Sequence, residues 1–500
     1  MATIKRNMVY WVGNNPTESE FLEFARRGLT IRSVEPTDEL DLNLARGIVF
    51  CARPPDVGAT CRRLDLVERA LDHGLIVYLV AANDSTQKHL QVAIGAVPFQ
   101  GPLSGNIRRR TGEIPPFEIA EVIARHDSGP HAEGALQVML PPATSLSDTD
   151  QFLLRRAFSD CAAISLESLS GGRSASAFVA QATLKDSEVG PRPLPFFVKL
   201  DASAKILVER NNYDLFASSH IPWYLRPNLD SRRCVIGSER GILVGSFVEH
   251  SESLWEAVLK GRGSRYIHAL FEETLMGWRS QGFRSEPRIG PIADSFSGAF
   301  NWEKVRPDYV QRSREFGEVG EPKNLWEDLL DLQGQKCRVA PMHGDLHAEN
   351  VRVRNNDSII IDLANTTRGP LCADVASLEV WLAFEVPSTP SRLPDRTTWT
   401  DFVTGVYSPA EISRSPSLAA PDVSLDWLRS CIRQTRMVAG AICECESEYA
   451  TVVAIYLLRR ACYSADDNNH NEDVFRRSYA YFLASRIIQH LSTLSRQQLV

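Results

Sequence analysis

The sequence lacks a hydrophobic run long enough to cross a membrane. Its most apolar helical stretch, YATVVAIYLL at residues 449–458, has about half of the ~20 residues that a membrane-spanning helix needs. The apolar run within the first residues, MATIKRNMVYWVGNN, is too short for the core of a signal peptide. We therefore expect a soluble protein that does not act in a membrane.

The sequence also lacks a regular pattern of cysteines. Its ten cysteines are scattered, and only Cys443 and Cys445 lie close together. Their one-residue gap, without a histidine nearby, suits neither a zinc knuckle nor a CxxC redox pair. Unpaired cysteines are typical of a reducing compartment, so the expected location is the cytoplasm.

Positive charge is not in excess either. The chain has 55 Lys and Arg against 62 Asp and Glu, for a net charge of −7, which argues against a nucleic-acid partner. The run RRR at 108–110 is more typical of an exposed loop than of a phosphate site.

The composition, with 43% hydrophobic and 23% charged residues, is that of a globular protein. A chain of 500 residues should form two or three domains.

Residues 1–125 alternate apolar runs with amphipathic stretches. Four β-branched and aromatic runs predict strands, at 8–13, 29–34, 47–52 and 75–81. The stretches between them include SEFLEFARRG and CRRLDLVERALDHG, which end at the helix-stopping Gly28 and Gly74. This alternation predicts an α/β domain with a parallel sheet covered on both faces.

The same domain resembles receiver-type or flavodoxin-like folds, but it lacks a receiver's phosphorylation chemistry. A working receiver needs clustered acids at the first strand end and an acceptor aspartate after the third. Here WVGNNPTE and FCARPPD place asparagines and Arg53 there, and the expected fifth-strand region, AVPFQG at 96–101, has no lysine. We expect a receiver-like domain that is not phosphorylated and that serves as a docking or sensing module, with a protein as its partner.

The order of predicted strands and helices changes after a polar stretch that contains Gly and Pro. Residues 126–147 predict a linker. Residues 148–250 contain a strand, a glycine turn and two further strands, followed by a helix. Residues 251–500 are largely helical, apart from one motif segment.

That segment, MHGDLHAENV, is followed by the apolar run SIIIDL. Asp345 and Asn350 are five residues apart in an expected loop, and Asp362 ends the next strand. Phosphoryl transfer needs one carboxylate to orient the attacking hydroxyl and take its proton, and oxygen ligands to hold Mg²⁺ against the nucleotide. Asp345 suits the first role, and Asn350 and Asp362 suit the second. The simpler alternative is that these residues only close a turn and cap the next segment.

The two histidines of the motif fit other roles. His343 is more typical of a structural hydrogen-bonding residue that braces the loop than of a proton carrier. His347 lies four residues further on and could form a zinc pair with it, but no third ligand is evident.

The stretch HGDLHAEN…IIIDLANT…GPLCADVASLE resembles the aminoglycoside phosphotransferase and choline-kinase-like family, which is related to the protein kinases. The resemblance implies an α+β bilobal protein-kinase-like domain, with an N-lobe at 148–250 and a helical C-lobe at 251–500. It also implies ATP and Mg²⁺ as cofactors. In the GPLCADVA segment it assigns Asp374 to structural support of the catalytic loop.

The upstream segment should then handle the nucleotide. Gly171 and Gly172 offer a turn in which backbone N–H groups could approach phosphates. Lys199 lies in a hydrophobic strand, where an unpaired ammonium is costly. The resemblance assigns Lys199 to the α and β phosphates and Glu209 to the ion pair that positions it. Arg210 and Lys205 are the ordinary surface alternatives, and the order of elements puts adenine near Phe247–Glu249.

Two features depart from the protein-kinase pattern. The segment DLANT lacks the glycine that follows the metal-binding aspartate, and the glycine turn is shorter than GxGxxG. Neither removes a charged catalytic group.

Three functions are therefore compatible with the sequence. The first is an ATP-dependent phosphotransferase acting on a small-molecule or protein acceptor, with a regulatory N-terminal domain. The second is a nucleotide-binding pseudokinase scaffold. The third is a regulatory component of a bacterial signalling or conflict system, because DLANTTRGPLCADVASLE also resembles the ternary-complex-associated kinase-like domains of such systems. The intact set of charged residues favours the enzyme.

Overall fold

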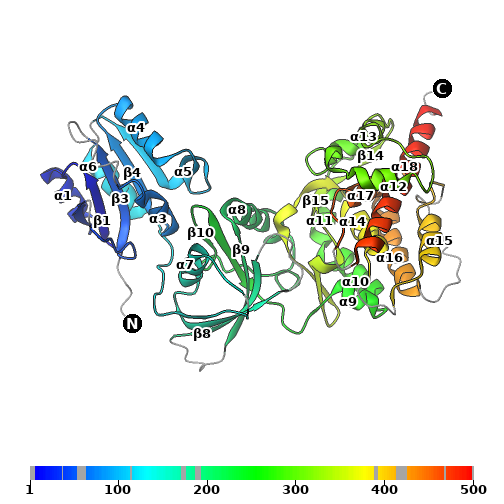
Figure 1. The fold of residues 1–500 in the computed structure, drawn as a ribbon, viewed down its shortest axis with the longest axis horizontal. Helices are drawn as coiled ribbons and strands as arrows, with labels where there is room; N and C mark the ends of the chain where they lie inside the picture. Colours follow the sequence, from blue (N-terminus) through cyan, green and yellow to red (C-terminus); the bar gives the residue numbers. More distant parts are fainter. Residues whose placement is uncertain are drawn as a thin grey trace. The chain divides into compact units, whose positions relative to one another are not determined.

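The structure is a computed structural model that describes residues 6–35, 38–52, 63–112, 115–142, 144–169, 176–185, 193–387, 392–410, 412, 425–466 and 469–497. Contacts between residues divide the chain into two compact units (Figure 1). The first unit comprises Met1–Arg210 and Asn228–Phe247, and the second comprises Asn211–Pro227 and Val248–Val500.

The first unit begins with a five-stranded parallel sheet of order β2-β1-β3-β4-β5. Its strands are β1 (Met8–Gly13), β2 (Thr30–Val34), β3 (Ala45–Ala52), β4 (Ile76–Ala81) and β5 (Ile107–Thr111). The first four correspond to the four predicted strands. This order is that of flavodoxin-like doubly wound sheets, so the predicted α/β parallel-sheet architecture is present.

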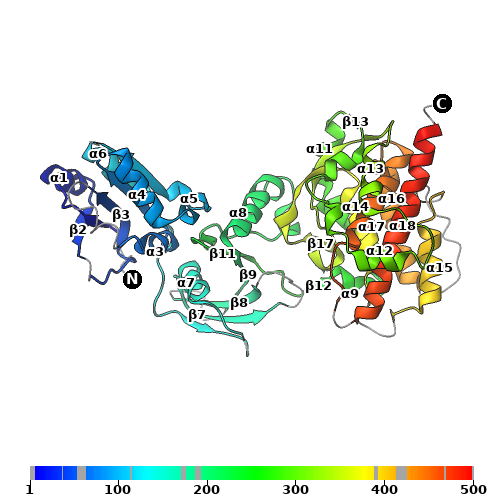
Figure 2. The same ribbon diagram turned by 45° about the horizontal axis from the view of Figure 1, so that its top comes forward.

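Helices cover both faces of this sheet, as Figures 1 and 2 show. The helices are α1 (Glu18–Arg26), α3 (Leu66–Asp72), α4 (Asp84–Ile94), α5 (Val97–Gln100) and α6 (Pro116–Arg125). Successive strand residues point to opposite faces. Val9 and Trp11 therefore pack with α1 and α6, whereas Tyr10 and Val12 pack in the core that contains α3 and α4.

The predicted position of the fifth strand was wrong. The segment at 96–101 contains helix α5, and the strand is β5, which includes the RRR run that we had expected in a loop. Strand β5 pairs only with β4 at the sheet edge, and Arg108, Arg109 and Arg110 are exposed. An edge strand with solvent on its outer side tolerates consecutive charges, so its sequence lacks the apolar pattern used for the prediction.

A second sheet of the first unit has the order β10-β11-β9-β8-β7-β6. Only the pair β6–β7 is parallel; the other pairs are antiparallel. The strands are β6 (Gln137–Met139), β7 (Cys161–Ser168), β8 (Ser176–Leu184), β9 (Leu194–Ala202), β10 (Val235–Ile236) and β11 (Arg240–Ser246), with helices α7 (Asp148–Ala157) and α8 (Ser203–Asn212). The strands predicted on either side of the glycine turn are thus β7 and β8, and the strand of Lys199 is β9. The predicted linker 126–147 contributes β6 to the sheet.

The second unit is mainly helical. Its helices are α9 (Leu254–Leu259), α10 (Gly263–Ala269), α11 (Met276–Arg284), α12 (Pro307–Ser313), α13 (Pro322–Leu330), α14 (Ala373–Phe384), α15 (Arg396–Val406), α16 (Asp426–Ile442), α17 (Glu446–Arg460) and α18 (His470–Gln497). Short pieces complete both units: 3₁₀ turns at Ser104–Asn106, Trp223–Leu225, Ile292–Phe296, Trp302–Lys304, Ala348–Asn350 and Leu363–Asn365, and π turns at Tyr213–Ala217 and Leu270–Thr274. Among the described helices, none is both long and apolar enough to cross a bilayer.

Short antiparallel strands of the second unit carry the motif segment. They are β12 (Glu252–Ser253), β13 (Arg288–Ile289), β14 (Lys336–Cys337), β15 (Val339–Met342), β16 (Val351–Arg354), β17 (Asp357–Ile360) and β18 (Thr367–Pro370). They form the sheets β12-β16-β17, β13-β14 and β15-β18.

A buried ion pair joins helices α14, α16 and α17. The fully buried carboxylate of Glu379 on α14 accepts hydrogen bonds from Arg436 and Thr435 on α16 and from Tyr449 on α17. Removing one partner of such a pair is costly, because the other charge stays buried. The network therefore fixes the position of α14, the helix that carries Asp374.

Candidate functional site

The loop His343–Asn350 is anchored at both ends by strand pairs. It follows β15, which pairs with β18, and it precedes β16, which pairs with β17. The N–H of Ile361 donates to the carbonyl of Asn350 at 2.9 Å. The segment that leads to Asp362 is therefore tied directly to the end of the loop.

Gly344 has a conformation that only glycine tolerates here. Its φ is +77°, and a Cβ at this position would lie 2.3 Å from the carbonyl oxygen of Asn365. The buried carboxylate of Asp374 accepts hydrogen bonds from the N–H groups of His343, at 2.8 Å, and Gly344, at 3.3 Å. Burial raises the pKa of Asp374. This geometry is the one expected of a residue that supports the loop.

Of the two histidines of the loop, His343 is buried and His347 is half-buried. His343 Nε2 lies 2.8 Å from the carbonyl oxygen of Ile361, to which it donates in the matching tautomer. The ring of His347 stacks on Trp381 with 5.5 Å between ring centroids, and burial lowers its pKa. Both rings therefore lie where they brace the loop.

The side chain of Asn350 contacts the main chain of Asp345. Asn350 Nδ2 donates to the carbonyl oxygen of Asp345 at 3.1 Å, which directs Oδ1 of the same amide the other way. The side chain of Asp345 is 39% exposed, so its carboxylate is accessible from solvent.

Arg459 is a site residue that the sequence did not reveal. From α17, its Nη2 lies 3.2 Å from the Asp345 carboxylate, and its Nη1 donates to the carbonyl of Gly344 at 2.6 Å. It also donates to the Tyr463 hydroxyl at 2.9 Å. Arg459 thus fixes the orientation of the Asp345 side chain. No local pattern identifies it, because it is 114 residues away in sequence within an apolar helix.

Asp362 has a left-handed backbone, with φ of 59° and ψ of 74°. Aspartate is one of the few residues other than glycine that adopt this conformation readily. Immediately after it, the carbonyls of Leu363 and Ala364 accept hydrogen bonds from Asn212 Nδ2, each at 3.0 Å. The hydrogen bonds from Asn212 therefore fix the segment that follows the left-handed backbone of Asp362.

The donor set of the loop fits a divalent cation. Asn350 Oδ1 and the Asp362 carboxylate are hard oxygen ligands of the kind that Mg²⁺ prefers. The hydrogen bond from Asn350 Nδ2 to the Asp345 carbonyl orients the amide so that its oxygen would be the ligand. Asn350 and Asp362 are thus the residues that would hold the metal.

The first unit contains the predicted lysine–glutamate pair. Lys199 Nζ lies 2.8 Å from the Glu209 carboxylate, and the two side chains are only 12% and 7% exposed. Lys199 lies on β9, between β8 and β11, and Glu209 on α8. The alternative cation Lys205 pairs with Asp201 instead.

The other residues predicted to bind the nucleotide lie outside the region of the Lys199–Glu209 pair or outside the described residues. Gly171 and Gly172 are outside the described residues. Phe247 is half-buried at the end of the first unit, and Glu249 is exposed in the second. The predicted nucleotide-handling residues thus belong to both units, and Asp345, Asn350 and Asp362 belong to the second.

Comparison with known proteins identifies the class of the motif segment. Residues 287–400 match the profile of the family described as the phosphotransferase enzyme family. This segment contains His343, Asp345, Asn350, Asp362 and Asp374. The match confirms that the motif segment resembles phosphotransferases, as the sequence predicted.

Solved structures with similarity to the chain include several kinases. One is an amicoumacin kinase in complex with AMP-PNP, Ca²⁺ and its ligand, which is 12% identical to this chain. The alignment covers 63% of this chain and 87% of the kinase, with a TM-score of 0.38. A Streptomyces rimosus aminoglycoside phosphotransferase is 18% identical, with 58% and 99% coverage and a TM-score of 0.30. A Cryptosporidium parvum choline kinase is 10% identical, with 67% and 89% coverage and a TM-score of 0.31. No curated protein sequence matches the chain.

Proposed function

We propose that this protein is an ATP- and Mg²⁺-dependent phosphotransferase that phosphorylates a hydroxyl or related nucleophile on a small molecule or a protein. The observation that supports this proposal most directly is the accessibility and fixed orientation of the Asp345 carboxylate. Its carboxylate is accessible, yet it is oriented by Arg459 on a loop that Asp374 holds at two backbone N–H groups.

In this proposal each charged residue has a separate task. Asp345 orients the acceptor hydroxyl and takes its proton during transfer. Lys199, positioned by Glu209, contacts the α and β phosphates. Asn350 and Asp362 hold Mg²⁺, which neutralises charge on the nucleotide phosphates when bound. Arg459 limits the motion of Asp345, so the carboxylate is in place before the acceptor arrives.

The experiment that tests this function measures transfer of labelled phosphate from ATP to a panel of acceptors. The panel should include aminoglycosides, choline, fructosamines and hydroxyl-bearing peptides, with and without Mg²⁺. Transfer to at least one class, dependent on Mg²⁺ and on Asp345, is the expected result. The complete absence of both nucleotide binding and transfer would contradict the proposal.

We propose further that the N-terminal domain regulates the kinase-like domain, because the two are joined by specific polar contacts. The Asp72 carboxylate at the end of α3 accepts hydrogen bonds from Ser238 N, at 2.7 Å, and Ser238 Oγ, at 2.8 Å. Arg156 on α7, almost fully buried, donates to the backbone carbonyls of Asp72, Ser128 and Pro130.

These contacts continue to the helix that carries Glu209. The turn between β10 and β11 bonds to Asp72 on one side. On its other side, the carbonyls of Glu239 and Ser238 accept from Ser203 N, at 2.8 Å, and Ser203 Oγ, at 3.2 Å. Ser203 is the first residue of α8. A change at the end of α3 can therefore alter the position of α8 and the Lys199–Glu209 pair.

Asp72→Ala should uncouple the two domains. It leaves the half-buried Ser238 N–H without its acceptor, which costs about 0.5–1.5 kcal/mol, the net contribution of one hydrogen bond. We expect faster amide hydrogen exchange at the start of α8, together with a several-fold change in the rate of phosphoryl transfer. The control is Asp65→Asn, which changes an exposed acid near the same helix. Unchanged exchange and unchanged transfer in Asp72→Ala would contradict the coupling.

The second candidate function is a nucleotide-binding scaffold. In this second function the N-terminal domain is the surface that binds a partner, because an additional domain favours a regulatory setting over simple drug modification. The two functions differ in their dependence on the Asp345 carboxylate.

A further inference from the structure

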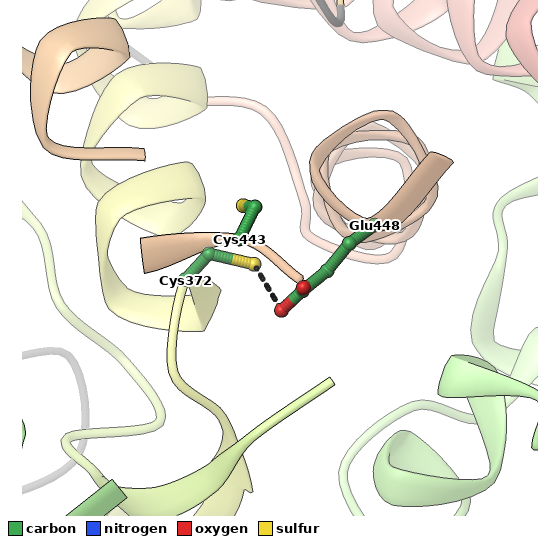
Figure 3. A group of neighbouring side chains, drawn as sticks. All are labelled: Cys372, Cys443 and Glu448. Carbon is green, nitrogen blue, oxygen red and sulfur yellow. Dashed lines mark hydrogen bonds between the residues drawn. The ribbon is translucent and has the colours of Figure 1, made fainter. Parts of the chain in front are cut away.

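A cluster of two cysteines and one glutamate lies where three helices of the second unit meet. Cys372 directly precedes α14, Cys443 directly follows α16, and Glu448 lies in the first turn of α17. One ligand atom from each, the two Sγ atoms and a carboxylate oxygen, all lie within 4.8 Å of one another. Figure 3 shows Cys372 and Glu448 pointing toward each other, with Cys443 beside them.

Glu448 is buried without a compensating cation. Its side chain is fully buried, and among the described residues no Lys, Arg or His forms an ion pair with it. One carboxylate oxygen accepts from the N–H of Glu444 at 2.6 Å, and the other lies 3.5 Å from Cys372 Sγ. A buried acid in this state is costly to keep ionised unless a positive charge is supplied.

Two further thiols lie in the same region. Cys337 on β14 is buried, and its thiol is close enough to Glu448, Cys443 and Cys445 to interact with them electrostatically. Cys445 Sγ lies 3.4 Å from the carbonyl oxygen of Lys336. Four of the cysteines therefore lie in this region, brought together from three separate parts of the sequence.

We propose that Cys372, Cys443 and Glu448 bind a structural zinc ion. Thiolates select thiophilic metals over Mg²⁺ and Ca²⁺. Zinc bound at about 2.3 Å from sulfur and about 2.0–2.2 Å from oxygen places its tetrahedral ligand atoms roughly 3.5 Å apart. The Cys372 Sγ–Glu448 distance already has this value. The fourth ligand is the thiol of Cys337 or Cys445, or a water molecule.

Zinc at this position would tie the start of α14 to the neighbouring helices. Two residues after Cys372, Asp374 holds the loop of Asp345. On binding, the two thiols release their protons to solvent, and the ion compensates the buried carboxylate. The proposal concerns the stability of the helical lobe and does not depend on phosphoryl transfer.

The test measures metal in the full-length protein, purified with a reducing agent and without nucleotide. Given ZnCl₂ and then desalted, the wild type should retain about one zinc ion per chain, and its melting temperature should rise relative to chelator-treated protein. MgCl₂ alone should not produce this rise. Cobalt in place of zinc should give a thiolate-to-metal charge-transfer absorption.

Variants identify the ligands. Cys372→Ser, Cys443→Ser and Glu448→Gln should lose the retained zinc and the zinc-dependent rise in melting temperature. Their matched controls are Cys431→Ser, at a fully buried thiol outside the cluster, and Cys462→Ser, at a half-buried one. Both controls should retain zinc. Loss of zinc in Cys337→Ser or in Cys445→Ser alone identifies the fourth ligand, and retention in both assigns water.

Wild-type protein that retains no zinc and shows no zinc-dependent melting shift would overturn the proposal, whatever the variants do. A Cys372–Cys443 disulfide that persists in the reduced protein would also overturn it. So would undiminished zinc in Cys443→Ser and Glu448→Gln. Since no ATP is present, none of these outcomes depends on whether the protein is a kinase.

Discussion

Asp345→Asn should lower the rate of phosphoryl transfer by about 10²–10⁴-fold, the usual contribution of a general base. The amide keeps the size of the side chain and can still accept from Arg459, but it cannot take the acceptor's proton. Affinity for Mg²⁺–ATP should change little, because the side chain serves the acceptor. Steady-state transfer rates and calorimetric titration with Mg²⁺–ATP measure the two effects separately.

The control for this variant is Asp357→Asn, which removes one negative charge from the strand β17 that leads to Asp362. It should transfer phosphate at the wild-type rate. Melting temperatures of both variants should match the wild type. Wild-type transfer or wild-type biological function in Asp345→Asn, with ATP still bound, would decide against the enzyme and in favour of the scaffold.

Asp362→Asn should weaken Mg²⁺–ATP binding as well as the rate. It removes a charged oxygen ligand of a hard cation, and we expect affinity to fall by at least about 10–100-fold, as is common when groups that organise a metal site are lost. Asparagine also adopts the left-handed backbone observed here, so the variant should stay folded. Calorimetry at several Mg²⁺ concentrations measures the loss.

The two variants together separate binding from chemistry. Asp345→Asn should bind nucleotide and transfer poorly, whereas Asp362→Asn should do both poorly, with partial recovery at high Mg²⁺. Unchanged Mg²⁺–ATP affinity in Asp362→Asn would remove this residue from the proposed metal site.

Much of the fold could be predicted because it depends on local patterns. The buried strands β1, β3 and β4 carry continuous β-branched and aromatic runs, and glycines mark the ends of the helices between them. Strand β5 was misplaced because an edge strand exposes its arginines and so lacks that pattern. The strand β6 was missed because it is only three residues long and lies in a polar segment.

The proximity of the motif residues could be predicted because their spacing in sequence is short. Asp345, Asn350 and Asp362 fall within one hairpin-like segment, and Lys199 and Glu209 within one strand–helix pair. Arg459 could not be found this way, since its contact with Asp345 depends on the packing of α17. The same is true of Cys372, Cys443 and Glu448, which are brought together only when α14, α16 and α17 pack around Glu379.

The strand order of the second sheet has a consequence for synthesis on the ribosome. Strand β9, which carries Lys199, is completed by β11, and β11 is made only after residues 211–227, which belong to the other unit. Until residue 246 has left the exit tunnel, the strand of Lys199 has an unpaired edge that can join other chains. The first unit is thus completed only after residues 211–227 of the other unit have been synthesised, and until then this edge of β9 is open to pairing with another chain.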